Sequence, residues 1–118
     1  MLKPGSCALI YAWARDQHAD SKPSIYLQND QDNYANQQEV TTECSLRLPV
    51  HENRTDFKHN DLLVPWKKKE GDESFHRYYH VFEEGELEDL LKSALAKTSF
   101  VIESIYYDQG NWCAIFKK

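Results

Sequence analysis

The sequence predicts one α/β domain, and three features of its hydrophobic pattern lead to this prediction. Residues 7–14 form a continuous apolar run, which is typical of a strand buried on both faces in a parallel sheet. Residues 85–96 place apolar side chains at helical spacing. Residues 100–107 and 112–117 are rich in β-branched and aromatic side chains, which predicts an antiparallel hairpin that closes the chain.

The first strand, "CALIYAWA", follows a turn signal, "KPG", and leads into a polar segment. Residues 15–45 are rich in Gln, Asn and Asp and show neither a helical nor a strand period. Such a segment buries too little apolar surface to offset the entropy cost of ordering it. We therefore expect a disordered polar insertion at about residues 15–45.

The middle of the chain regains the patterns of ordered structure. The X-Pro steps at Pro49 and Pro65 favour extended backbone before each proline, and residues 62–66 supply an apolar anchor. Residues 75–82, "FHRYYHVF", alternate without producing a purely apolar face, which predicts an edge strand or an extended loop.

The helix expected over residues 85–96 has acidic residues at its start and lysines towards its end, an order that complements the helix dipole. The segment "DQGN" at residues 108–111 predicts a four-residue hairpin connection, in which Gly110 is able to take a positive φ. The apolar stripe of the helix consists of Leu87, Leu90, Leu91, Ala94 and Leu95.

Composition and charge restrict the class of protein. The chain has 118 residues, a net charge of −5 and a pI near 5.5, so a globally basic nucleic-acid binder is not expected. No apolar run reaches the roughly 18 residues that a membrane-spanning helix needs. The start of the chain lacks the cleavage pattern of a signal peptide, so we expect a cytoplasmic protein, with the nucleus as a further location.

The three cysteines, Cys7, Cys44 and Cys113, predict free thiols. They are an odd number, lie far apart and form no CxxC pair, so no disulfide framework is expected. Cys7 and Cys113 fall in predicted strands, and we interpret both as buried.

Signatures of metal, nucleophile and phosphate sites are absent from the sequence. His76 and His80 stand four apart in a segment that reads as extended, where they would lie about 13 Å apart, and no HExxH occurs. Neither GxSxG, a P-loop nor GxGxxG is present. We therefore expect no metal site and no cofactor-binding residues in this chain.

Cations and aromatic rings do occur together, in the mixture that RNA sites use for phosphates and unstacked bases. The alternative interpretation is a solvated lysine loop beside an aromatic edge strand. The residues concerned are Arg54, Trp66, Lys67, Lys68, Lys69, Arg77, Tyr78 and His80.

The segment "LKPGSCALIYAWA" resembles the entry to the fifth strand of a class I S-adenosylmethionine-dependent methyltransferase, although Ser6 stands where the family usually has a glycine. Together with "LPVHENRTDF", "DLLVPW", "FHRYYHVFEEGELE" and "YYDQGNWCAIFKK", it resembles the C-terminal half of the wobble-uridine tRNA methyltransferases. The likeness is greatest to the methyltransferase domain of their animal AlkB-homologue group. Five segments match in order, and the match leaves out mainly the polar insertion.

This resemblance implies the C-terminal portion of a class I, Rossmann-like sheet that ends in an antiparallel hairpin, with the N-terminal half missing. The family's glycine-rich loop and acidic ribose-binding residue would lie in that missing half. The site for the cofactor S-adenosylmethionine would then be mostly outside this chain, and the chain alone is expected to be inactive. The implied activity is methylation of the carboxymethyl group of wobble 5-carboxymethyluridine, and the implied partners are tRNA and a small zinc-binding activator protein.

For this activity the catalytic candidates are Arg77, His80 and Arg54, with Arg77 favoured as the cation that holds the substrate carboxylate. The alternative to an enzyme is a non-catalytic truncated fragment that only binds RNA or a protein. The candidates for substrate or RNA binding are Trp66, Lys67, Lys68, Lys69, His76 and Tyr78.

Overall fold

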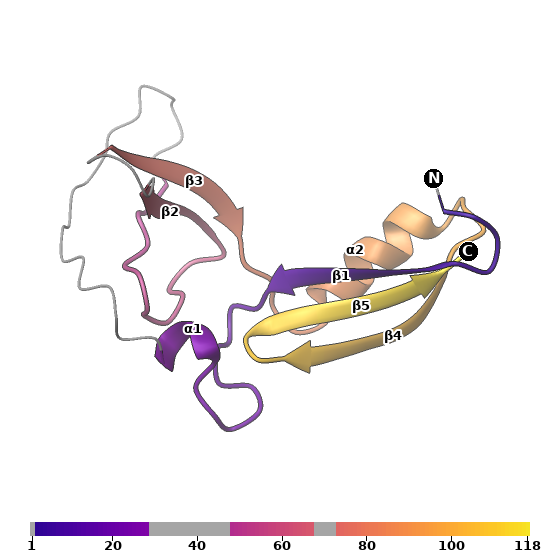
Figure 1. Cartoon of the computed structure of the whole chain (residues 1–118), viewed down its shortest axis with the longest axis horizontal. Coiled ribbons are helices and arrows are strands. Elements are labelled where there is room, and N and C mark those ends of the chain that lie inside the picture. The colour runs from indigo at the N-terminus through magenta and orange to yellow at the C-terminus, as the bar shows by residue number, and fades with distance from the viewer. Residues whose placement is uncertain (1, 29–47, 68–72) are drawn as a thin grey trace.

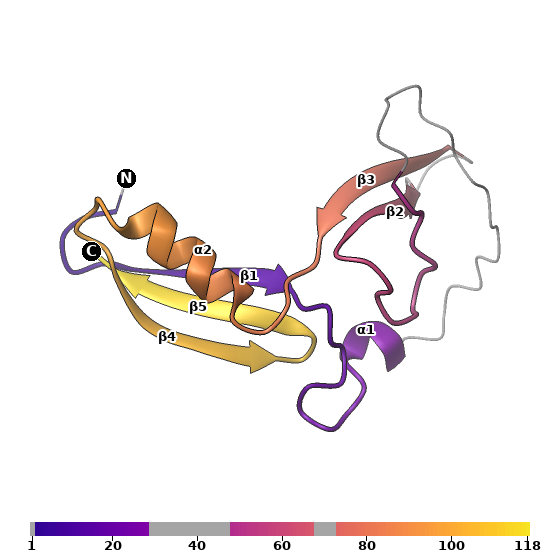
Figure 2. The ribbon, with the colours of Figure 1, turned by 180° about the vertical axis from the view of Figure 1, so that it is seen from behind.

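A computed structural model describes residues 2–28, 48–67 and 73–118 of the chain (Figure 1). A three-stranded sheet with one covering helix forms one part of the fold, and a two-stranded ribbon projects from its end (Figures 1 and 2). The elements in chain order are β1 (Cys7–Trp13), α1 (Ile25–Gln28), β2 (Asp61–Lys67), β3 (Ser74–His80), α2 (Glu86–Leu95), β4 (Val101–Asp108) and β5 (Asn111–Lys117).

The three-stranded sheet has the order β1-β5-β4, and both of its strand pairs are antiparallel. The expectation of a parallel strand at residues 7–14, buried on both faces, is therefore wrong for the described residues. Alternate side chains of β1 face α2, whereas Leu9 and Tyr11 on the other face are 50% and 52% exposed. Apart from two isolated parallel bridges, the parallel arrangement of a Rossmann-like sheet is not seen in this part of the chain.

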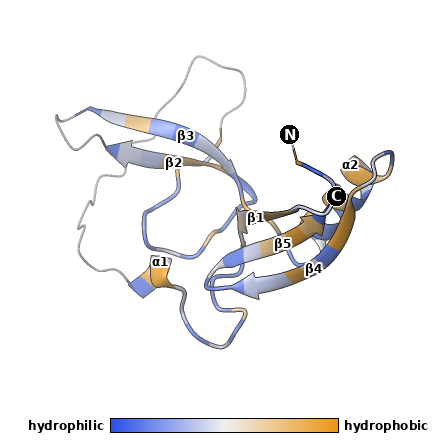
Figure 3. Cartoon of the chain, turned by 45° about the vertical axis from the view of Figure 1, so that its right-hand side comes forward, coloured by the Kyte–Doolittle hydropathy of each residue, from blue (hydrophilic) through white to orange (hydrophobic). Residues whose placement is uncertain are grey.

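Helix α2 confirms the helix expected over residues 85–96 and covers one face of the three-stranded sheet. Leu87 and Leu91 are buried against Ala114 of β5. Leu90, which the sequence places in the same apolar stripe, is 54% exposed. The buried stripe of the helix is therefore narrower than expected. Figure 3 shows how hydrophobic residues concentrate along α2, β4 and β5.

The hairpin of β4 and β5 confirms the prediction for the end of the chain, with a shorter connection than expected. Asp108 and Asn111 belong to the strands and pair with each other, so only Gln109 and Gly110 connect them. Both connecting residues have positive φ, 46° and 90°, as a tight type I′ turn requires. A Cβ atom on Gly110 would lie 2.3 Å from Oε1 of Gln17, so this glycine also allows a close approach.

The second sheet is the β2–β3 ribbon, which confirms the edge strand expected near residues 75–82. One face of its base packs into an aromatic core that contains Phe57, Leu62, Val64 and Val81. Trp13 at the end of β1 stacks on Tyr79 of β3, with 4.6 Å between the ring centroids. This core therefore joins the ribbon to the three-stranded sheet.

The polar insertion does not begin where the sequence predicts. Residues 15–28 are part of the described structure, and Gln17 and Ser24 are 2% and 3% exposed. Gln17 donates from Nε2 to the carbonyls of Ala14 and Gly110, and its Oε1 accepts from the Ser24 hydroxyl. The rest of the predicted insertion, residues 29–45, lies outside the described residues.

The thiols agree only in part with the expectation. Cys113 is buried, as expected, whereas Cys7 is exposed because it lies on the open face of β1. Cys44 lies outside the described residues. None of the helices in the described ranges is long and apolar enough to cross a membrane.

Candidate functional site

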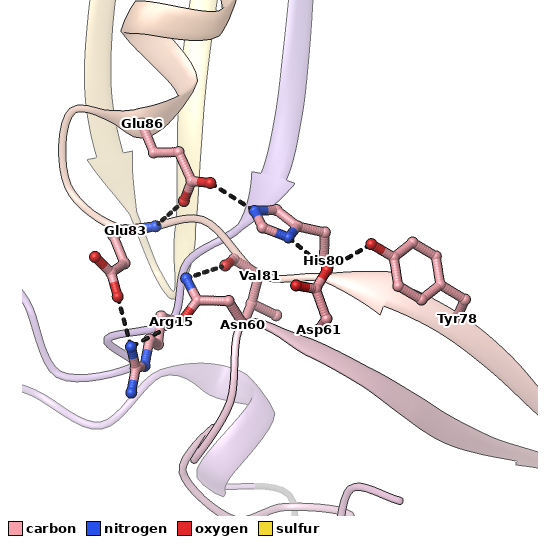
Figure 4. Close-up of polar contacts among 8 residues, drawn as sticks. All are labelled: Arg15, Asn60, Asp61, Tyr78, His80, Val81, Glu83 and Glu86. Atoms are coloured by element: carbon pink, nitrogen blue, oxygen red, sulfur yellow. Dashed lines mark hydrogen bonds and ion pairs between the residues drawn. The ribbon is translucent and has the colours of Figure 1, made fainter. Parts of the chain in front are cut away.

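The base of the ribbon is hydrogen-bonded to the end of β1. The backbone N–H of Phe82 donates to the carbonyl of Trp13, and the N–H of Arg15 donates to the carbonyl of Phe82, both at 2.8 Å. The Arg15 guanidinium also donates to Asn60 Oδ1 at 2.8 Å and to Glu83 Oε1 at 2.5 Å (Figure 4). These bonds fix where the ribbon leaves the sheet.

Next to this junction lie Asp61, Tyr78, His80 and Glu86, which we call the acid–histidine cluster (Figure 4). His80 bridges two carboxylates, with Nδ1 2.9 Å from Asp61 Oδ1 and Nε2 2.7 Å from Glu86 Oε1. The Tyr78 hydroxyl donates to Asp61 Oδ1 at 2.5 Å. The other oxygen of Glu86 accepts from the backbone N–H of Glu83 at 2.8 Å. The cluster thus links β2, β3 and the start of α2.

The contacts in the cluster favour the charged forms of Asp61, His80 and Glu86 and the neutral form of the Tyr78 phenol. Hydrogen bonds from Tyr78 and then His80 lower the pKa of Asp61, and the Glu83 N–H followed by His80 lowers the pKa of Glu86. The bond to Asp61, reinforced by Glu86, raises the pKa of His80. A neutral imidazole has one N–H donor, so only the imidazolium form is able to donate to both carboxylates. The two contacts and the raised pKa therefore both favour the cationic form of His80.

The ribbon carries a second group of side chains on the face opposite the acid–histidine cluster. This group lies at the end of the ribbon away from the aromatic core. We call Trp66, Phe75 and Arg77 the ring–guanidinium platform. Cζ of Arg77 lies 4.3 Å from the centroid of the Trp66 ring, and the Trp66 and Phe75 centroids are 6.3 Å apart. Trp66 and Phe75 are 40% and 42% exposed, and Arg77 is exposed. The platform therefore presents rings and a cation to solvent.

Arg54 belongs to neither of these groups, because it packs on α1. Its backbone N–H donates to the Tyr26 hydroxyl at 3.0 Å, and its guanidinium donates to the Tyr26 carbonyl at 3.1 Å. The Tyr26 hydroxyl also lies 2.8 Å from Nε2 of the buried His51. Burial lowers the pKa of His51 to about 4, so His51 is neutral near pH 7. Arg54 thus supports the aromatic core.

The structure divides the predicted site residues between the two faces of the ribbon. The strand register places Trp66 and Arg77 on one face, and His76, Tyr78 and His80 on the other. Lys67 ends β2, whereas Lys68 and Lys69 lie outside the described residues.

Sequence reasoning missed the two carboxylates that bind His80. Asp61 is directly opposite His80 in the ribbon, which only the strand register reveals. The helix dipole explains an acidic residue at the start of α2, and the contact of Glu86 with His80, six residues earlier in β3, has no local signal in the sequence. Within the described ranges, no group of three or more metal-ligating side chains is placed to hold a metal ion.

Within the described ranges, no turn has the glycine-rich form that commonly binds a nucleotide-type cofactor such as S-adenosylmethionine. Gly5, Gly85 and Gly110 are isolated in three different turns, so they form no glycine-rich cradle of backbone N–H groups in this part of the chain. The space beside Gly110 is filled by Gln17 and Ser24. The adjoining cavity, walled by Trp13, Tyr26 and Phe57, has a volume of about 60 Å³. A larger and more open hollow of about 460 Å³ lies beside Arg15, Asp56 and Glu83.

Comparisons with known proteins identify relatives over the whole chain. The chain is 30% identical to the tRNA (carboxymethyluridine(34)-5-O)-methyltransferase ALKBH8 of Macaca fascicularis, in a match that covers 100% of this chain and 26% of that protein. Its counterpart from Xenopus tropicalis is 35% identical, with 100% and 22% covered. A match at 40% identity covers 54% of this chain and 14% of the probable tRNA methyltransferase 9B of Homo sapiens.

These matches confirm the resemblance drawn from the sequence. The chain spans only 22–26% of the length of the two relatives that it matches throughout. No protein-family model matches the chain.

Proposed function

Taking as our premise that the chain corresponds to one segment of the longer wobble-uridine tRNA methyltransferases, we propose that it forms part of an enzyme that methylates tRNA. The observation that carries this proposal is the match over 100% of the chain to proteins named for that activity. The finer proposal is that the acceptor is the carboxymethyl group of wobble 5-carboxymethyluridine and that the product is a methyl ester.

The proposed chemistry demands little proton transfer from the protein. A carboxylate oxygen is already a nucleophile, and S-adenosylmethionine supplies the methyl group when it is bound. The protein must then hold the acceptor in position and control its charge without neutralising its reactivity. A planar guanidinium suits this task because it binds the two oxygens of a carboxylate as a fork.

Arg77 is the arginine that we assign to the substrate carboxylate. It is exposed, and its contact with the face of the Trp66 ring restricts where the guanidinium lies. Arg54 is bound to Tyr26, and His80 is bound to Asp61 and Glu86. We therefore propose that Arg54 and His80 act as positioning residues, whereas Arg77 touches the substrate.

The test is a chimera in which this chain replaces the aligned segment of the Xenopus tropicalis relative. We expect the chimera to convert carboxymethyluridine in tRNA to its methyl ester, as measured by mass spectrometry of nucleosides. Arg77→Ala should lower the rate at least about tenfold, the scale of one lost charge-assisted contact. Lys117→Ala, which removes an exposed cation from β5, is the matched control. A chimera that folds and lacks methyl transfer would refute the proposal.

A second candidate function is a non-catalytic module that binds RNA or a protein. It is favoured by the exposed platform and by the lack of a cofactor cradle in the described ranges. An inactive chimera that still binds tRNA would select this alternative. A zinc-binding activator remains an expectation from the resemblance, and a cytoplasmic or nuclear location remains one from the start of the sequence.

A further inference from the structure

We propose that the ring–guanidinium platform binds an unpaired nucleotide of RNA, with the base stacked against the rings and an oxyanion of the nucleotide paired with Arg77. The proposal rests on the proposed function for the identity of the RNA as tRNA. It extends that function, because it places a binding site for single-stranded RNA on this chain that works without methyl transfer.

The cation–ring contact of Arg77 with Trp66 supports an oxyanion ligand. Cζ of Arg77 lies over the indole ring, 4.3 Å from its centroid, so the cation is in contact with the face of the ring. A guanidinium has five N–H donors in its plane, and they pair well with the oxygens of a phosphate or carboxylate. Within the described ranges, no carboxylate forms an ion pair with Arg77.

The rings of the platform are suited to a base. The Trp66 and Phe75 planes are inclined by 46° with centroids 6.3 Å apart, so Phe75 does not stack on Trp66. Because Arg77 lies over one face of Trp66, the proposed base stacks on the other face of that ring. By contrast, Trp13 in the core is stacked on Tyr79 at 4.6 Å. Exposed single rings are ordinary, but two neighbouring rings beside a cation match the stacking surfaces of single-strand binders.

The two faces of the ribbon differ in where their carboxylates lie. The paired residues on the platform face include no carboxylate. The other face carries Asp61, and its cluster has two carboxylates for one imidazolium. Lys67 also lies on that other face, so the two faces differ in that only the platform face carries a cation without a carboxylate. The platform therefore attracts a polyanionic strand. The same rings and arginine would also suit a protein partner, but tRNA is what the names of the relatives specify.

An unpaired base is required because the bases of a duplex are stacked on each other and are out of reach of a protein ring. The platform should therefore bind single-stranded RNA and discriminate against a duplex of the same length. Two oxyanions on an unpaired nucleotide fit Arg77, namely a backbone phosphate and the carboxylate of 5-carboxymethyluridine. A phosphate contact would form with any single-stranded RNA, whereas a carboxylate contact would need the modified base.

The experiment measures the Kd of the 118-residue chain for a fluorescent ten-nucleotide uridine RNA by anisotropy, with circular dichroism as the check on folding. Its arms are the plain RNA, the same RNA with one 5-carboxymethyluridine, and a duplex. The variants are Trp66→Ala, its conservative counterpart Trp66→Phe, and Arg77→Ala. The matched controls are Tyr11→Ala, an exposed ring on β1, and Lys117→Ala.

We expect Trp66→Ala to weaken binding of the single strand at least about fivefold, since stacking of one base on a ring accounts for that change or more. Trp66→Phe should restore most of the affinity, and both controls should bind as the wild type does. Arg77→Ala should reduce the salt dependence of binding by about 0.7 in log–log slope if it contacts a phosphate. Tighter binding of the carboxymethylated RNA that Arg77→Ala abolishes would assign the contact to the carboxylate.

Three results would overturn the inference. One is the absence of RNA binding by the folded wild-type chain, and another is equal affinity for the single strand and the duplex. The third is a Trp66→Ala variant that binds as tightly as the Tyr11→Ala control. None of these results bears on methyl transfer by the chimera, so failure of the platform is distinguishable from failure of the proposed function.

Discussion

Replacing His80 with glutamine tests whether the acid–histidine cluster depends on an imidazolium ion. Glutamine is uncharged at every pH. Its one amide group cannot direct an N–H donor to each of two separate carboxylates, as the imidazolium ring does. In the wild type, Nδ1 and Nε2 of His80 reach Asp61 and Glu86 at 2.9 and 2.7 Å. The substitution therefore removes at least one of the two charge-assisted bonds that join the ribbon to α2.

The magnitude follows from the bond between His80 and Glu86. A hydrogen bond to a charged group contributes about 1.5–3 kcal/mol, and exposed ion pairs contribute about 0.2–1 kcal/mol. The His80 and Glu86 side chains are 29% and 37% exposed, so solvent screens this pair in part. We therefore expect a loss of about 1 kcal/mol, which lowers Tm by about 3 to 5 °C in a chain of this size.

The loss should depend on pH with a definite sign. The pKa of His80 is higher in the folded chain than in the unfolded chain, where it is about 6.5. The stabilisation is complete below pH 6.5 and disappears as the pH rises through the folded-state pKa. Asp61 and Glu86 remain ionised at pH 5.5, because their pKa values are lowered. The effect of the substitution should thus be largest near pH 5.5.

The assay is thermal unfolding followed by circular dichroism at pH 5.5 and pH 9, for the wild type and the His80→Gln variant. His59→Gln, which removes an exposed histidine, is the matched control and should change Tm little at either pH. An equal decrease of Tm at both pH values would refute the claim that the cluster favours the cationic form of His80.

Three further predictions concern the rest of the fold. The folded-state pKa of His51, about 4, lies below its unfolded value, so protonation of His51 in acid should destabilise the folded chain. His51→Gln should therefore flatten the rise of Tm between pH 4 and 6.5, and an unchanged slope would contradict this reasoning. Gly110→Ala should cost about 1–3 kcal/mol in urea unfolding, because φ is 90° and the new Cβ would displace Gln17, whereas a neutral effect would exclude a rigid turn. Titration calorimetry of this chain with S-adenosylmethionine should show no micromolar binding, since the described residues form no cradle for it; a micromolar Kd would overturn that expectation.

Local patterns in the sequence were sufficient for the elements that depend on short-range periodicity. The leucines of α2 recur at helical spacing, and the β-branched segments around Gly110 form the expected hairpin. The β2–β3 ribbon was also predictable as an edge, because alternation there leaves neither face apolar.

Contacts between distant segments could not be predicted in the same way. An apolar run such as residues 7–14 indicates burial but not the direction of the partner strand, and β1 pairs with a strand about 100 residues later. The burial of Gln17 depends on a carbonyl that Gly110 presents, and polar composition alone therefore misplaced the start of the insertion. His80 was selected as a candidate, but its role follows from Asp61 and Glu86, which only the tertiary structure brings to it.

Mass spectrometry of wobble nucleosides from tRNA treated with the chimera that carries this chain shows whether this segment supports methyl transfer. We predict formation of the methyl ester of 5-carboxymethyluridine, at a rate that falls at least about tenfold in Arg77→Ala and stays unchanged in Lys117→Ala. A folded chimera that leaves the carboxymethyl group unmethylated, or an Arg77→Ala variant as active as the control, would contradict the account.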